Sequence, residues 1–252
     1  MKKKILFLGV LAIMSLNSYS NDKVMGKNPD TNVNVEEDVN SSTTVRDLKN
    51  HGYVDLGLPS GLLWATCNMG ANSSADYGDY YSFGEVKAKM KKENPWKNLY
   101  YRGRWSDVEV TEEKIKGNSK YDAATAKWGG SWRLPTADEI DELIDECTWE
   151  WTRNVNSKGK KVFGYKVTGP NNNSIFLPAA GYWGIKRGTD GKKKIHDVKR
   201  TGTYLSCSPS TVNESSDLSY SLYFYYINPS NKKSLREAYL RGIGQSVRPV
   251  SE

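Results

Sequence analysis

The sequence predicts an α+β domain, in which two helices accompany small twisted antiparallel sheets and long loops. Residues 129–136 (GGSWRLPT) join a glycine turn to a strand-like core and then to a helix start. A single strong amphipathic helix pattern follows them. Short apolar segments separated by Gly, Pro, Asn and Ser make up most of the remaining chain, as in a protein of many short strands.

The strongest helix is expected over residues 137–149. The Thr136 hydroxyl can cap the first turn, and the Glu139 side chain, three residues later, can accept from the Thr136 backbone N–H. This is the pattern of a capping box. The apolar residues then recur at the spacing of one helix face: Ile140, Leu143, Ile144 and Cys147. Acidic residues occupy the first turn and the opposite face. We interpret them as a solvated surface rather than a calcium or acid–base site.

A second, shorter helix is expected over residues 123–128, with Asp122 as its N-terminal cap and Gly129 at its end. The other apolar segments are expected to form strands. Their ranges are 53–56, 62–67, 165–167, 174–178, 202–206, 220–227, 234–239 and 245–250.

The strand expected over residues 220–227 is apolar on both faces. Tyr220, Leu222, Phe224 and Tyr226 point one way, whereas Ser221, Tyr223, Tyr225 and Ile227 point the other way. Two interpretations stay open. The segment is either a central strand covered on both sides, or a tyrosine platform for a sugar ring or a partner protein.

The N-terminus has the pattern of a secretory signal peptide. Lys2, Lys3 and Lys4 precede an apolar run over residues 5–14, and small polar residues follow. The run is shorter than the roughly 20 residues of a membrane helix, and no later segment approaches that length. We expect residues 1–20 to be removed and the protein to be exported to the periplasm, the cell surface or the medium. A buried N-terminal helix is the alternative.

The charge excess is mild. Removing residues 1–20 takes away three lysines and no acids, so the formal charge falls from +7 to +4. This excess predicts no nucleic-acid partner. Most of it lies in residues 87–97 and 186–200, which we interpret as solvated loop insertions. A polyanion or an acidic glycan at these loops is the alternative.

Three cysteines, Cys67, Cys147 and Cys207, follow the signal segment. An odd number in an oxidising compartment leaves one thiol outside any internal disulfide. A Cys67–Cys147 disulfide is one possibility, with Cys207 as the free thiol. The spacing of the cysteines and of the two histidines, His51 and His196, predicts no metal or thiol-redox site.

The composition divides the mature chain in two. Residues 21–50 are rich in Asn, Asp, Ser, Thr and Val, and we expect a flexible N-terminal arm. All eight tryptophans and every tyrosine except Tyr19 lie from Tyr53 onward. Residues 51–252 are therefore expected to form one domain with a substantial core.

Several motifs in this domain resemble the Fibrobacter succinogenes major paralogous domain family, which is known mainly from secreted and surface proteins of Bacteroidetes. The resemblance covers nearly all of residues 53–252. In chain order the motifs are residues 53–68 (YVDLGLPSGLLWATCN), 77–85 (YGDYYSFGE), 129–136, 164–168 (GYKVT), 174–182 (SIFLPAAGY) and 246–250 (SVRPV).

The resemblance implies a C-type-lectin-like fold of the formylglycine-generating-enzyme branch. In that fold the terminal strands lie together, which would bring residues 53–56 near residues 245–250. It also implies that Arg133 and Arg248 are structural and pair with carboxylates or loop carbonyls.

Two activities of related proteins are not expected of this chain. The Glu-Pro-Asn or Gln-Pro-Asp loop and the Trp-Asn-Asp strand of calcium-dependent lectins are missing from the sequence. The cysteines also stand in motifs unlike that of the formylglycine-generating nucleophile. We therefore expect no enzyme activity, no cofactor and no bound metal.

The function expected from these features is that of a noncatalytic, calcium-independent binding module for a glycan or a surface protein. Aromatic rings can stack on a sugar, and Asn and Ser supply adaptable hydrogen bonds. The candidate contacts are Tyr182, Trp183, Tyr204, Ser206, Ser208, Tyr223, Tyr225, Asn228 and Asn231.

Two other classes of function stay open. A structural subunit would use the arm over residues 21–50 to add a strand to another copy. A hydrolase acting on a surface polymer would need a nucleophile with a base or two spaced carboxylates. The sequence has no motif that brings such groups together.

Overall fold

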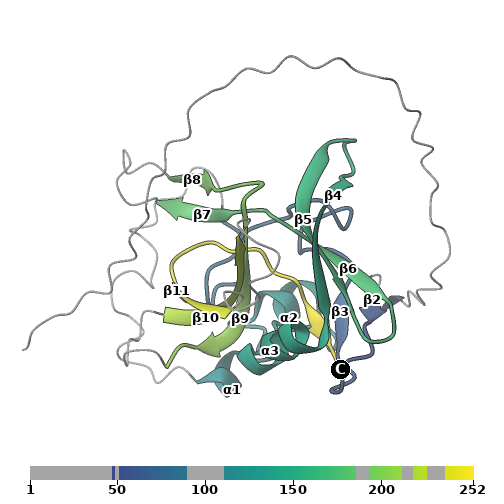
Figure 1. Cartoon of the computed structure of the whole chain (residues 1–252). Coiled ribbons are helices and arrows are strands. Elements are labelled where there is room, and N and C mark those ends of the chain that lie inside the picture. Colours follow the sequence, from purple (N-terminus) through teal and green to yellow (C-terminus); the bar gives the residue numbers. More distant parts are fainter. Residues whose placement is uncertain (1–46, 49–50, 90–110, 186–192, 212–217, 226–235) are drawn as a thin grey trace, which may run out of the picture. The chain divides into compact units, whose positions relative to one another are not determined.

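The computed structural model describes residues 47–48, 51–89, 111–185, 193–211, 218–225 and 236–252 (Figure 1). The described part contains three helices and several small antiparallel sheets, which agrees with the α+β class. The helices are α1 (Glu112–Ile115), α2 (Ala123–Trp128) and α3 (Ala137–Glu146). None of the helices in these residues is long and apolar enough to cross a membrane.

Two sheets have three strands each. One has the order β4-β5-β6, with β4 (Thr148–Val155), β5 (Lys161–Thr168) and β6 (Ser174–Pro178). The other has the order β11-β10-β9, with β9 (Thr201–Pro209), β10 (Leu218–Tyr225) and β11 (Arg236–Leu240). A separate two-stranded sheet pairs β7 (Tyr182–Ile185) with β8 (Lys193–His196).

A four-stranded sheet joins segments from both ends of the described chain. Its order is β1-β2-β3-β12, with β1 (Asp47–Leu48), β2 (His51–Asp55), β3 (Leu63–Ala65) and β12 (Val250–Ser251). Trp64 of β3 pairs with Val54 on one side and with Val250 on the other. The two ends therefore share a sheet, although β3 lies between them. The expected strand over residues 245–250 is mostly a set of isolated bridges.

The two predicted helix starts are confirmed. The Asp122 carboxylate accepts hydrogen bonds from the backbone N–H groups of Ala124 and Thr125, and Thr136 with Glu139 completes a capping box on α3. Helix α3 ends earlier than expected, at Glu146, because Thr148–Val155 pairs along its whole length with β5.

The main core lies between α3 and the two three-stranded sheets. Ile140, Leu143 and Ile144 of α3 belong to one buried cluster with residues of β5, β6, β9 and β10. Tyr165 of β5 and Phe224 of β10 meet edge to face, with ring centroids 5.2 Å apart. Residues 220–225, the described part of the segment 220–227, thus lie in the middle strand of a three-stranded sheet, but Tyr223 and Tyr225 are not fully covered.

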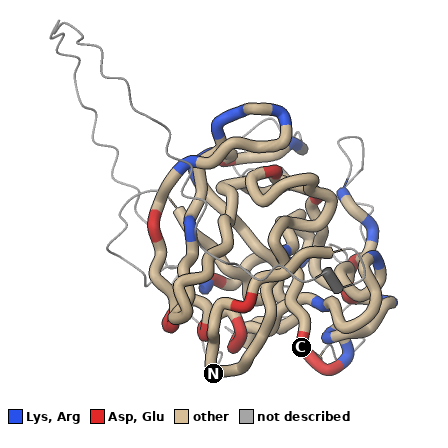
Figure 2. Tube along the Cα trace, turned by 90° about the vertical axis from the view of Figure 1, so that its right-hand side faces the viewer, with Lys and Arg blue, Asp and Glu red and all other residues tan. Residues whose placement is uncertain are grey.

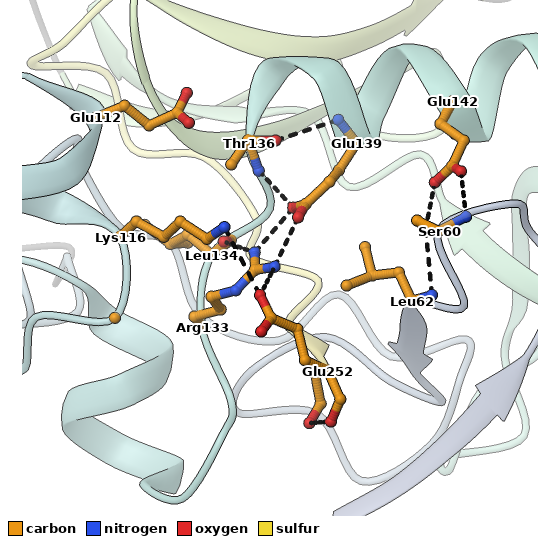
Figure 3. Close-up of polar contacts among 12 residues, drawn as sticks. Ser60, Leu62, Glu112, Lys116, Arg133, Leu134, Thr136, Glu139, Glu142 and Glu252 are labelled. Carbon is orange, nitrogen blue, oxygen red and sulfur yellow. Dashed lines mark hydrogen bonds and ion pairs between the residues drawn. The ribbon is translucent and has the colours of Figure 1, made fainter.

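Arg133 joins the C-terminus to the start of α3 (Figure 3). Its guanidinium donates to both carboxylate oxygens of Glu139, at 2.8 and 2.6 Å, and to Glu252 at 2.9 Å. Planar, bidentate pairing of this kind fixes geometry as well as charge. The expected structural role of Arg133 is confirmed by these contacts.

Arg248 is buried and is surrounded by oxygen acceptors. It donates to the side chain of Asn68 and to the carbonyl oxygens of Ala65, Thr66 and Phe176, all at 2.9–3.0 Å. Burial lowers the pKa of this guanidinium. The contacts confirm the expected pairing with carbonyls and connect the end of β3 to β6.

The structure describes all three cysteines and has no disulfide between them. Cys147 and Cys207 are buried, whereas Cys67 is half-buried next to the Thr66 hydroxyl. The Cys67–Cys147 disulfide is therefore not formed in this structure. Burial raises the pKa of the Cys207 thiol, which makes it a weak nucleophile at neutral pH.

Candidate functional site

The structure separates the nine expected contact residues into three groups. Tyr182 and Tyr223 are half-buried, and Tyr225 is 38% exposed. A second group is buried in the domain: Trp183, Tyr204, Ser206 and Ser208. Asn228 and Asn231 lie outside the described residues.

The four buried residues are engaged inside the protein. The Tyr204 hydroxyl donates to the Pro178 carbonyl at 2.8 Å, and the Ser206 hydroxyl donates to the Tyr220 carbonyl at 2.6 Å. Ser208 accepts from the backbone of Ala137, at the start of α3. Trp183 packs with Tyr80 and Ala180.

These burials have a common cause, which the strand patterns did not reveal. Residues 201–208 of β9 are buried on both faces, because the core lies on both sides of this strand. Trp183 of β7 belongs to a further buried cluster. We therefore correct the expected site by leaving Trp183, Tyr204, Ser206 and Ser208 out of it.

The remaining tyrosines form a group with one residue that sequence reasoning missed. Tyr239 of β11 lies against Tyr223 of β10, with ring centroids 5.4 Å apart and ring planes inclined at 39°. The two hydroxyl groups also influence each other's pKa. We call Tyr182, Tyr223, Tyr225 and Tyr239 the tyrosine surface.

Strand register explains why Tyr223 and Tyr239 meet. Tyr239 pairs with Ser219, which lies on the same face of β10 as Ser221 and Tyr223. Because the two serines are small, the large rings can contact each other across them. The alternation of serine and tyrosine in residues 219–225 was the signal in the sequence. Tyr239 could be added to the group only once the register of β11 against β10 was known.

Burial favours the neutral form of two phenols in the tyrosine surface, Tyr223 and Tyr239. Burial raises the pKa of Tyr223, and burial followed by the neighbouring Tyr223 raises the pKa of Tyr239. Tyr182 lies beside His196, with ring centroids 5.4 Å apart. At neutral pH these side chains therefore present aromatic rings and uncharged hydroxyl groups.

Two buried serines lie on the Tyr223 face of β10. Ser219 and Ser221 are completely buried, and in the described part of the chain their hydroxyl groups have no hydrogen-bond partner. Buried polar atoms in proteins almost always bond to protein, water or ligand. These atoms are thus suited to hold polar groups, such as water or hydroxyls, next to the tyrosines.

Among the described residues, no group of three or more His, Cys, Asp and Glu side chains is placed to hold a metal ion. The absence of a metal requirement stays a prediction from the sequence.

Comparison with known proteins identifies no relative: no family model, no curated protein and no solved structure matches the chain.

Proposed function

We propose that the mature chain is an exported, noncatalytic module that binds a glycan through the tyrosine surface, without calcium. The observation that carries the proposal is the contact between Tyr223 and Tyr239, with the exposed Tyr225 two residues along β10. Partly exposed tyrosines offer both an apolar ring face and a polar hydroxyl. A sugar ring has the complementary combination of C–H groups and hydroxyls.

The neutral state of the tyrosines supports an uncharged ligand. Because burial raises the pKa of Tyr223 and Tyr239, their hydroxyls remain donors and acceptors across the physiological pH range. Recognition would rest on ring stacking and hydrogen bonds rather than on ionic attraction. Binding of this ligand should therefore change little with salt.

The scaffold for this function is proposed to be C-type-lectin-like, in the Fibrobacter succinogenes major paralogous domain family. The proposal rests on the motifs quoted above and on two structural features. The β1-β2-β3-β12 sheet contains segments from both ends of the domain. Arg133 and Arg248 make the structural contacts that the resemblance implies.

A glycan is favoured over assembly through the N-terminal arm. Asp47–Leu48, inside the segment expected to be that arm, pairs with β2 of the same chain. This pairing occupies the β2 edge that a strand from another copy would use. A protein ligand for the tyrosine surface is then the main alternative outcome of a binding test.

The test uses the protein purified after export, screened on a glycan array and then by calorimetry with calcium and with chelator. We expect saturable binding that survives the chelator and is lost in a Tyr223→Ala, Tyr225→Ala double variant. Tyr223→Phe should keep most of the affinity if ring stacking dominates.

Phe163→Ala is the matched control, because Phe163 is a similarly exposed aromatic residue (37%) on the other three-stranded sheet. It should leave glycan binding unchanged. A folded protein that binds no glycan, or that loses binding equally in Phe163→Ala, would contradict the proposal and direct the search to protein partners.

A further inference from the structure

A cleft of about 670 Å³ lies on the β4-β5-β6 sheet, a region to which the sequence assigned no function. Thr152 and Asn154 of β4, Lys166 of β5, and Ser174 and Phe176 of β6 share one face of this sheet and line the cleft. The remaining lining residues are Val54, Thr66, Ser74, Arg153 and Ile175. We call this feature the polar cleft.

The polar cleft has the size and lining of a small-ligand site. Binding pockets typically measure roughly 300–1,000 Å³ and combine apolar surface with a few placed polar groups. Here Val54, Ile175 and Phe176 supply the apolar part. The hydroxyls of Ser74, Thr152 and Ser174 supply hydrogen-bonding groups around it.

Two cations line the cleft without ion-pair partners. Within the described residues, neither Arg153 nor Lys166 forms an ion pair, whereas Arg133 and Arg236 each pair with a carboxylate. The acid nearest in register is Glu150, directly opposite Lys166 across β4 and β5. Lys166 shares the cleft face with the hydroxyl-bearing residues, whereas Arg153 lies on the opposite face of β4. A ligand carrying negative charge would therefore meet Lys166, which forms no ion pair within the described residues.

The surrounding sheet is also basic. Residues 148–178 contain five Lys or Arg residues and one acid, Glu150, which gives this segment a net charge of 5 − 1 = +4. Lys158, Lys160 and Lys161 are exposed in and beside the β4–β5 turn. Figure 2 faces this side of the molecule and shows basic residues at the tip of the projecting hairpin. A basic rim raises the local concentration of anions.

Arg248 supports the cleft from behind. It donates to the carbonyl oxygens of Thr66, which directly follows β3, and Phe176 of β6, which both line the cleft. These bonds hold the two walls at a fixed separation. The site is thus built on strands fixed by a buried guanidinium, which favours a preformed binding geometry.

We infer that the polar cleft binds an anionic sugar, with Lys166 on its acidic group and the hydroxyl-bearing residues on its hydroxyls. The acidic group is a carboxylate or a sulfate. Both carry a negative charge on several oxygens, which basic side chains recognise. This site is distinct from the tyrosine surface, so the inference does not depend on the proposed function.

The experiment measures binding by calorimetry with trigalacturonate, with a sulfated trisaccharide and with a neutral trisaccharide, using the exported protein. We expect one or both acidic probes to bind and the neutral probe not to bind in the cleft. The preferred probe identifies the acidic group. Lys166→Gln should weaken acidic binding by about tenfold, and Arg153→Gln, on the opposite face of β4, should weaken it less.

A Lys158→Gln, Lys160→Gln double variant is the matched control, because it removes cations from the same hairpin outside the cleft lining. It should reduce affinity much less than Lys166→Gln. If it weakens binding as much as Lys166→Gln does, the site is a general basic surface and the inference is wrong.

A salt titration and a variant of the tyrosine surface complete the test. Raising NaCl from about 0.05 M to about 0.5 M should weaken acidic binding several-fold, because partly exposed charges are screened over that range. Tyr223→Ala should leave binding of the acidic probes intact. An absence of acidic binding in the cleft can therefore be distinguished from an absence of glycan binding at the tyrosine surface. Absence of binding by both acidic probes at low salt would overturn the inference.

Discussion

The tyrosine surface and the polar cleft lie on two three-stranded antiparallel sheets, yet they present opposite chemistry. On β10 and β11 the partly exposed tyrosines are held neutral by burial. On β4 to β6 the cleft face carries Lys166, which forms no ion pair in the described part of the chain, beside hydroxyl groups. The same sheet architecture can therefore support an uncharged and an anionic ligand, because the side chains and not the strand order set the specificity.

The cations of the molecule show a similar contrast. Arg133 and Arg248 are buried and hydrogen-bonded to carboxylates or carbonyls, so their guanidinium groups stabilise the fold and do not face a ligand. Arg153 and Lys166 line a cleft without an ion pair in the described residues. Net charge alone does not distinguish these roles, whereas burial and pairing do.

The largest expected effect comes from Arg248→Met, which removes the support behind the polar cleft. The carbonyl oxygens of Ala65, Thr66 and Phe176 would lose their donor inside the core. We expect the free energy of unfolding to fall by about 3–5 kcal/mol, as measured by denaturant titration. Arg153→Met, on the exposed cleft wall, is the control and should change stability little. Equal stability losses would refute the division into structural and ligand-facing cations.

Alkaline pH should destabilise the fold through the buried phenol of Tyr81. Burial, followed by the charge of Asp79, raises the pKa of Tyr81 from 10.0 to about 12. Since the folded pKa is the higher one, the stability contributed by the neutral phenol is complete below pH 10 and is lost as pH rises toward 12. Denaturation midpoints should fall across this window. Tyr81→Phe should make that fall shallower, and an unaltered slope would exclude Tyr81 as a contributor.

The smallest expected effect comes from Glu150→Gln. This change removes the acid opposite Lys166 and makes the cleft more positive. Binding of an acidic trisaccharide should tighten by about twofold, measured by calorimetry, because a partly exposed charge contributes only a few tenths of a kcal/mol. Binding of a neutral glycan to the tyrosine surface should not change. Weaker acidic binding would show that Glu150 itself contacts the ligand.

Local features of the fold were predictable from the sequence. The caps formed by Asp122 and by Thr136 with Glu139 depend on residues three positions apart or closer, and they appear as expected. Strand β6 was also located correctly, at Ser174–Pro178. These features rest on short-range spacing, which a sequence displays directly.

Features that depend on long-range packing were not predictable. The helical pattern over residues 137–149 gave no sign that Trp149 belongs to a strand paired with β5. Tyr204 and Ser206 have the composition of contact residues, but core on both sides of β9 buries them. The polar cleft combines residues from β2, β4, β5 and β6, so no local motif marks it.

The most direct test of two separate sites is a calorimetric comparison of two ligands on two variants. The ligands are a neutral glycan identified on the array and the acidic trisaccharide, and the variants are Tyr223→Ala and Lys166→Gln. We predict that Tyr223→Ala loses only the neutral ligand and that Lys166→Gln weakens only the acidic one. Loss of the same ligand in both variants would contradict the account, because it would mean that one site serves both.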